Sequence, residues 1–218
     1  MSTLFAPGCA LVVYKPELAK KVETYLMESG QIDGVHMICC HHDPGQPKGT
    51  VFVNTCAGCD RRFRELYDDV DTVSMWEMIA AMDSFPFPDY GGARMSVHDA
   101  CPTRDQPRVH NAVRTLLERM NIKVVEAEKT RENSRCCGSI YCEKGLPMEE
   151  VYEKCRDRGE DFPCENVVCY CVACAMYLHA GGKKPRYLVD LLFGESTSLE
   201  RGDIVPLNDK VKLFIKTH

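Results

Sequence analysis

The chain has little of what marks membrane, secreted or nucleic-acid-binding proteins. None of its apolar runs reaches the roughly 18 residues that a membrane span needs, and its first residues lack the basic-then-apolar layout of a secretory signal. With 27 basic against 32 acidic side chains, the net charge is −5, which gives no electrostatic reason to bind a phosphate backbone. We therefore expect a cytoplasmic protein with no membrane span and no nucleic-acid partner.

Nucleotide-binding signatures are missing as well. The pattern Gly-x-Gly-x-x-Gly does not occur, and neither does a phosphate-binding loop with its lysine and glycines. No sequence motif therefore predicts a flavin or a nicotinamide nucleotide. If the protein uses electrons, we expect a partner protein to supply them.

Cysteine is what the chain has in excess, with 14 among 218 residues. Ten of them form two copies of one pattern, which is a single cysteine, an adjacent pair and then Cys-x-x-Cys. The first copy is Cys9, Cys39, Cys40, Cys56 and Cys59, and the second is Cys101, Cys136, Cys137, Cys171 and Cys174. In a reducing compartment such clusters are typical of metal-binding or redox-active sites rather than of disulfides. Exposed thiols oxidise unless something holds them as thiolates, and a metal is the natural holder.

A segment rich in proline and glycine, residues 84–92, divides the chain. We expect a shortened first repeat over 1–84, a second repeat over 93–195 and a C-terminal tail over 196–218. The end of the tail alternates polar and apolar residues, which favours an edge strand or a docking segment.

Both repeats are expected to alternate strands and helices. We expect strands or short apolar runs at 4–7, 34–38, 50–54, 70–73, 94–98, 122–127 and 165–170. Helices are expected at 16–30, 60–69, 75–82, 108–120, 147–158 and 187–193. This alternation favours an α/β fold with mainly parallel strands. Because the carboxyl ends of parallel strands share one edge of a sheet, the five cysteines of each set are expected to meet there.

The number and placement of the thiols bear on what they bind. Each Cys-x-x-Cys pair is expected at a helix start, where free N–H groups and the positive dipole end favour thiolate charge. Five thiols exceed the four that a structural zinc ion or one cubane cluster requires. Adjacent cysteines are also awkward for a single ion, since neighbouring side chains on an extended chain diverge. A larger, irregular cluster accommodates both the fifth thiol and the adjacent pair. The alternative is a zinc-stabilised structural or interaction module.

These motifs resemble a known family. The pattern Cys101-x34-Cys136-Cys137-Gly138-x32-Cys171-x-x-Cys174, together with the first copy, is similar to the duplicated cysteine-rich CCG domain found in heterodisulfide reductase. The likeness covers roughly residues 4–193 and includes the stretch 97–101, which leads into Cys101. It implies two tandem Rossmann-like repeats with small, mainly parallel sheets related by pseudo-two-fold symmetry. It also implies that the ten motif cysteines bind two noncubane 4Fe-4S clusters, five to each.

The resemblance carries a functional expectation too. In that family a disulfide is reduced between the two clusters, and the electrons arrive through a ferredoxin-like iron-sulfur subunit. The chain is therefore expected to be an oxidoreductase subunit of a hetero-complex, acting on a small-molecule or protein disulfide. Related CCG domains serve in dehydrogenase complexes, so the alternative is an electron relay without a substrate of its own. No catalytic residue is predicted beyond the ligands.

The first copy departs from the family pattern. Fifteen residues separate Cys40 from Cys56, against thirty-three between Cys137 and Cys171, which leaves room for a loop and no helix. His41 and His42 follow the paired cysteines where the family has glycine, and either is a candidate ligand.

Other side chains near the motifs have weaker signals. His98 is expected to be a hydrogen-bond donor behind the cluster rather than a ligand. Cys169 alternates with Cys171 along a strand and is expected to pack in the core. Four arginines flank motif cysteines and are candidates to hold an anionic substrate, although most such arginines are solvated or paired with carboxylates: Arg61, Arg62, Arg104 and Arg135.

Overall fold

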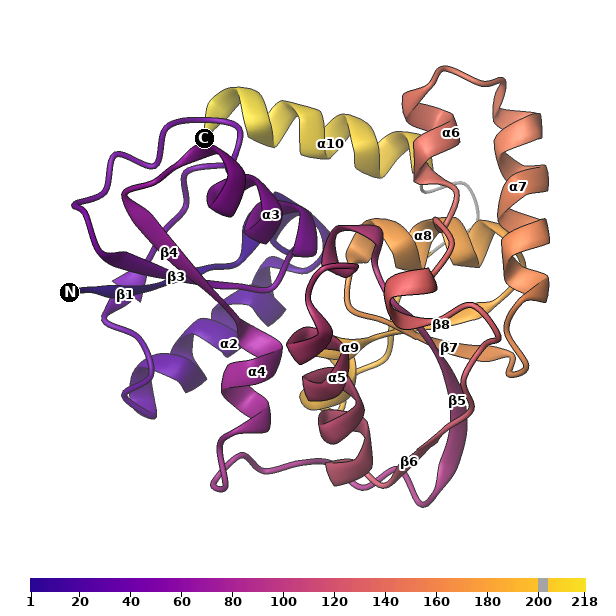
Figure 1. Ribbon diagram of the computed structural model, residues 1–218, viewed down its shortest axis with the longest axis horizontal. Coiled ribbons are helices and arrows are strands. Elements are labelled where there is room, and N and C mark those ends of the chain that lie inside the picture. The colour runs from indigo at the N-terminus through magenta and orange to yellow at the C-terminus, as the bar shows by residue number, and fades with distance from the viewer. Residues whose placement is uncertain (200–203) are drawn as a thin grey trace. The chain divides into compact units, whose positions relative to one another are not determined.

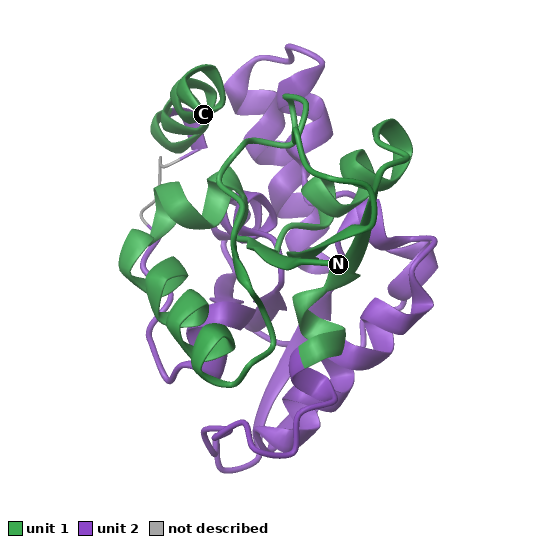
Figure 2. Ribbon diagram, turned by 90° about the vertical axis from the view of Figure 1, so that its left-hand side faces the viewer, with its two compact units in different colours: residues 1–78, 206–218 green, residues 79–205 purple. Residues whose placement is uncertain are grey.

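The computed structural model describes residues 1–199 and 204–218 (Figure 1). They form two compact units, residues 1–78 with 206–218 and residues 79–205 (Figure 2). Each unit is an α/β fold on a four-stranded, all-parallel sheet with helices beside it. The predicted fold class, two tandem Rossmann-like repeats, is confirmed.

The first unit has the strand order β2-β1-β3-β4. Its strands are β1 (Thr3–Ala6), β2 (Gly34–Val35), β3 (Thr50–Asn54) and β4 (Val70–Ser74). Its helices are α1 (Gly8–Tyr14), α2 (Pro16–Glu28) and α3 (Ala57–Leu66). It also contains most of α10 (Ile204–Thr217) and the first part of α4 (Met75–Ala80), which crosses into the second unit after Met78.

The second unit repeats this topology with the order β6-β5-β7-β8. Its strands are β5 (Ala93–His98), β6 (Ile122–Val124), β7 (Asn166–Cys169) and β8 (Lys184–Tyr187). Its helices are α5 (Pro107–Arg119), α6 (Ser139–Glu143), α7 (Met148–Glu160), α8 (Val172–Ala180) and α9 (Leu188–Leu192), with 3₁₀ turns at Cys101–Thr103 and Arg131–Asn133.

Local sequence explains these elements. Pro16 occupies the first position of α2, where a missing N–H costs nothing, and the buried Leu18, Val22 and Leu26 repeat at helical spacing. Val167 and Val168 in β7 are both fully buried, as expected for a parallel strand covered on both faces.

Several elements differ from the expectation. β2 and β6 are shorter than expected, because the chain leaves each sheet early toward its cysteine pair. The sequence analysis did not predict α1, α6 or β8. The edge strand expected for the end of the tail is wrong, because residues 204–217 form α10. The polar and apolar alternation covers only residues 210–216, which is too short to outweigh apolar residues at helical spacing. Tail residues 200–203 lie outside the described part of the chain.

The two units divide the chain after Met78, and residues 206–218 group with the first unit rather than forming a separate tail. The proline- and glycine-rich segment 84–92 lies within the second unit. Among the described residues, no helix combines the length and apolar character that crossing a bilayer demands.

Candidate metal centres

The first cysteine set gathers at the carboxyl ends of three neighbouring strands. Cys9 follows β1, the pair Cys39 and Cys40 follows β2, and Cys56 and Cys59 follow β3. Their thiols form a row of hydrogen-bonding contacts in the order Cys9, Cys39, Cys40, Cys59, Cys56. The structure thus brings together all five residues that the sequence pattern selected.

The second set is arranged in the same way. Cys101 follows β5, Cys136 and Cys137 follow the loop after β6, and Cys171 and Cys174 follow β7. The row of thiol contacts runs in the corresponding order: Cys101, Cys136, Cys137, Cys174, Cys171. Two independent stretches of chain therefore build the same five-thiol arrangement.

In each row, the first cysteine of the adjacent pair has a strongly lowered pKa. Hydrogen bonds from Cys40 and Cys9 lower the pKa of Cys39 to about 2. At the matching position, hydrogen bonds from Cys101 and Cys137 lower the pKa of Cys136 well below the usual range for a thiol. The thiols that donate are correspondingly harder to ionise; the pKa of Cys40, for example, rises to about 12 because of its bond to Cys39. In each row the hydrogen bonds thus favour a thiolate next to further sulfur donors, an arrangement that suits a cation.

Backbone N–H groups at helix starts add to this effect. The pKa of Cys56 falls to about 7 because of its hydrogen bond with Cys59 and because the N–H groups of Cys59 and Gly58, in the first turn of α3, donate to its sulfur. In the second set, the N–H groups of Gly138 and Ile140 at the start of α6 donate to Cys136.

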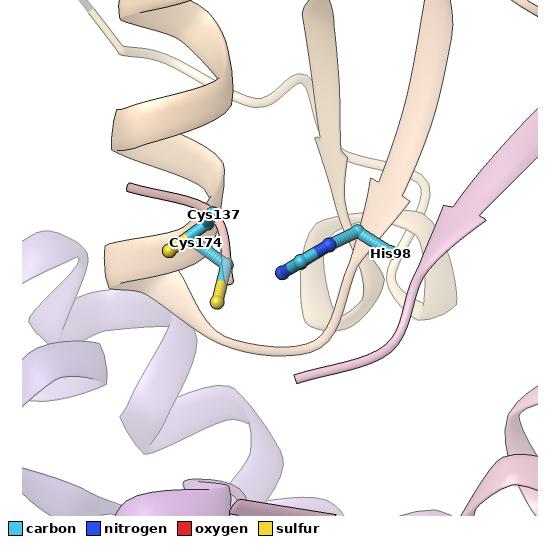
Figure 3. Close-up of side chains that lie close together, drawn as sticks. All are labelled: His98, Cys137 and Cys174. Atoms are coloured by element: carbon cyan, nitrogen blue, oxygen red, sulfur yellow. The ribbon is translucent and has the colours of Figure 1, made fainter. Parts of the chain in front are cut away.

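A buried histidine faces the second set. The ring of His98, at the end of β5, points toward Cys137 and Cys174, and the ligand atoms of the three lie within 4.8 Å of one another (Figure 3). Its Nε2 has no hydrogen-bond partner among the described residues, and its Nδ1 lies 3.2 Å from Nη2 of Arg158. Burial, together with the charge of Arg158, lowers the pKa of His98 to about 3. This group is able to contact a metal centre.

A second buried network lies next to His98. The carboxylate of Asp99 is fully buried and binds Arg114 through two contacts of 2.5 and 2.8 Å. It also accepts hydrogen bonds from the hydroxyls of Tyr170 and Thr130. Burial raises the pKa of Asp99, but the hydrogen bond and charge of Arg114 outweigh it and bring the pKa to about 2. The network ties β5, α5 and the end of β7 together around the loop that carries Cys101.

The flanking arginines all have partners within the protein. Arg61 lies 4.0 Å from Glu65, and Nε of Arg62 donates to the carbonyl of Cys40 at 3.3 Å. The other two also have partners: Arg104 donates to the carbonyl of Ser134 at 2.7 Å, and Arg135 binds Asp157 and Asp161 at 2.6 and 3.0 Å. Arg61 and Arg135 thus pair with carboxylates, as expected for most such arginines, whereas Arg62 and Arg104 donate to backbone carbonyls.

The two candidate histidines of the first set are exposed. His42 is committed elsewhere, because its Nε2 lies 2.6 Å from the carbonyl oxygen of Ile215 in α10. The N–H of His41 donates to the thiol of Cys39, so its backbone contributes to the site. As predicted, the segment between Cys40 and β3 contains no helix.

The cysteines outside the pattern have structural surroundings. Cys169 is fully buried, as expected of a core residue, and its Sγ lies 3.7 Å from the carbonyl of Val167. Cys155, in α7, is also fully buried, and burial raises its pKa to about 11. Cys142 and Cys164 are half-buried.

Sequence reasoning missed Arg158, Asp99 and Arg114. Asp99 directly follows His98 at a strand end, so the position of a carboxylate two residues before a motif cysteine was a usable signal. Arg158 had no such signal, because it lies among charged neighbours on a helix and only the fold shows that it is 2% exposed.

Comparison of the chain with protein-family models, with curated proteins and with solved structures found no match.

Proposed function

We propose that this protein is an iron-sulfur redox protein, in which each unit holds a polynuclear cluster through its five motif cysteines. The observation that carries this proposal is the repeated row of thiols: two stretches of sequence converge on the same order of sulfur contacts at the same edge of the same topology.

A row of five sulfurs suits a polynuclear cluster better than one ion. A structural zinc ion takes four ligands in a compact tetrahedron. The one group of ligand atoms mutually within 4.8 Å in the described part of the chain has three members, His98, Cys137 and Cys174. It leaves Cys101, Cys136 and Cys171 unused, although all three take part in the row. A cluster of several irons gives each sulfur in the row a metal.

The chain's own residues would hold and tune such a group. Bound iron-sulfur clusters supply one-electron transfer. The thiolates of each row would anchor the irons, and the N–H groups at the starts of α3 and α6 would donate to cluster sulfurs. The buried walls around Cys137 and Cys174 would limit the access of water.

Disulfide reduction is the reaction we propose for these centres. Cleaving a disulfide takes two electrons and two protons and yields two thiols, and two one-electron centres in one chain match that demand. The electrons would come from a ferredoxin-like iron-sulfur partner in a hetero-complex, because the sequence contains no nucleotide-binding motif. Electron relay without a substrate is the competing function.

The test is anaerobic purification followed by iron and sulfide analysis and EPR. We expect about eight irons per chain, as two four-iron clusters require. Cys137→Ser removes a buried member of the second row and should lower the iron content by about half. Cys164→Ser, which alters a half-buried cysteine outside both rows, is the matched control and should leave it unchanged.

Other outcomes would reject the proposal. Zinc without iron would identify a zinc-stabilised module, and a colourless protein free of metal would leave no redox centre. If iron is present, turnover of a model disulfide by the chemically reduced protein separates a reductase from a relay.

A further inference from the structure

We propose that His98 donates a hydrogen bond from Nε2 to a sulfur of the second centre and so raises the reduction potential of that centre. This inference rests on the proposed function, because it concerns the tuning of one of the two clusters. It assigns His98 the role of a donor rather than of a ligand.

The tautomer follows from the partner of Nδ1. The guanidinium of an arginine carries only donors. Nη2 of Arg158 lies 3.2 Å from Nδ1 of His98, so Nδ1 must accept and cannot carry a proton. The neutral ring then carries its proton on Nε2, the atom that faces Cys137 and Cys174. A nitrogen that carries a proton donates a hydrogen bond and has no lone pair to offer a metal.

Arg158 is held in place for this role. It is 2% exposed, its Nη1 lies 2.6 Å from Asp161 and its Nη2 lies 3.2 Å from the hydroxyl of Ser134. Its guanidinium stacks over the ring of Phe162 at 4.3 Å. These contacts make Arg158 a positioning residue that fixes the ring of His98.

The unpartnered nitrogen indicates that a ligand completes the site. His98 is fully buried, and its Nε2 has no hydrogen-bond partner among the described residues. An orphaned N–H at such a place costs free energy. A sulfur made electron-rich by bound iron is a suitable acceptor at this position.

The first unit lacks this donor at the equivalent position. Ala6 is the equivalent of His98, because it lies three residues before Cys9, as His98 lies three residues before Cys101. Ala6 and His98 are each the last residue of their strand, and each pairs with the last residue of the neighbouring strand. The alanine offers no hydrogen bond. The buried histidine of the first unit, His36, comes instead directly after β2, stacks on Phe52 at 4.3 Å and lines a small cavity with Cys9 and Cys39. Its Nε2 also has no hydrogen-bond partner among the described residues, but no partner of its Nδ1 fixes the tautomer there as Arg158 does for His98.

The sign of the effect follows from charge. Reduction adds an electron to the cluster, so a donor to its sulfur stabilises the reduced form more than the oxidised form. The hydrogen bond from His98 should therefore raise the reduction potential of the second centre, and loss of the donor should lower it.

The experiment is an EPR-monitored redox titration of the intact protein and three variants. In His98→Phe, a ring of similar size without nitrogen, we expect one of the two midpoint potentials, that of the second centre, to fall. The equilibrium constant for its reduction should decrease about tenfold, or about 59 mV for one electron. His98→Gln keeps an N–H donor and should restore much of the shift. His36→Phe is the matched control in the first unit and should leave the potential that His98→Phe lowers unchanged.

A measurement on the unaltered protein covers the case in which His98→Phe fails to fold. Pulsed EPR of protein with ¹⁵N-labelled histidine should show the weak nitrogen coupling of a hydrogen bond and an exchangeable proton. Strong coupling, typical of nitrogen bound to iron, would overturn the inference, and so would a potential that stays the same in His98→Phe. A protein without iron would overturn the proposed function itself, whereas unchanged potentials in an iron-loaded protein would overturn this inference alone.

Discussion

Gly138, directly after the second cysteine pair, shows how a single residue depends on a helix distant in sequence. Its backbone φ is 123°, a region that favours glycine, and a Cβ there would lie 2.6 Å from Sγ of Cys155 in α7. The first set has His41 at this position, and no helix follows before β3. The glycine is therefore needed where α7 packs behind the cysteines, and the first unit has no such helix.

Gly138→Ala should destabilise the protein by on the order of 1–3 kcal/mol, because it adds both a strained φ and an overlap. Urea denaturation of the metal-free protein measures the change. Gly145→Ala is the control, since Gly145 also has a positive φ, 76°, with nothing within 4 Å of the added carbon. Gly145→Ala should lower the free energy of unfolding by less than Gly138→Ala does. Adding Cys155→Ala to Gly138→Ala removes the overlapping sulfur and should recover part of the lost stability. The steric explanation would be refuted if the double variant were destabilised by the full sum of the two single changes in unfolding free energy.

At the scale of the element, α7 and α8 approach each other closely through glycine. A Cβ on Gly159 would lie 2.9 Å from the carbonyl oxygen of Gly181, and one on Gly181 would lie 2.3 Å from that of Cys155. These are backbone atoms, which cannot rotate away as a flexible side chain does. The close approach places Arg158 of α7 next to Nδ1 of His98 in β5, so the packing of the helices holds the donor that keeps the proton of His98 on Nε2.

The sign of the stability change in Gly159→Ala tests this packing. In an isolated helix, alanine is favoured over glycine by about 1 kcal/mol. Here we expect the opposite, a destabilisation of about 1–3 kcal/mol, because the helices must separate. Lys154→Ala, on the exposed face of the same helix, should change the free energy of unfolding by less than about 0.5 kcal/mol. A stabilised Gly159→Ala protein in thermal or urea unfolding would contradict the close contact.

At the scale of the whole molecule, the chain repeats one topology and returns its last helix to the first unit. In α10, Ile215 packs against the apolar cluster that includes Cys39, Cys40 and Cys59. The carbonyl of His218 accepts the N–H of Cys39 at 3.2 Å, and Phe214 lines a small cavity with Cys9 and Cys39. Residues late in the chain therefore cover a site built from its first 59 residues.

Weakening the contact between α10 and the first cysteine set should expose the thiols of that set and not those of the second. In Ile215→Ala we expect alkylation of Cys39 and Cys40 in the metal-free protein to accelerate about fivefold. The reason is that weakening the contact of α10 by about 1 kcal/mol raises, by about that factor, the population of molecules in which α10 is detached from the first set. Mass spectrometry after timed alkylation measures each thiol. Leu213→Ala, which alters a side chain 63% exposed on the same helix, should have no effect. Equal acceleration at Cys136 and Cys137 would point to global unfolding instead.

The amino-acid sequence by itself determined the α/β class, the parallel strands and which cysteines belong together. These features depend on local periodicity and on the rule that parallel strands end at one edge, so spacing along the chain is enough to predict them. The strands at 50–54 and 94–98 and the helix beginning at Pro16 follow for that reason.

Only the tertiary structure decided the order of the sulfur contacts, the burial of Arg158 and the helix at residues 204–217 beside the first cysteine set. Each depends on packing between segments far apart in sequence: α7 against α8, β5 against α7, and α10 against the first unit. An exposed and a buried arginine look the same in a sequence, because burial and tautomer are set by neighbours that the fold alone brings into contact.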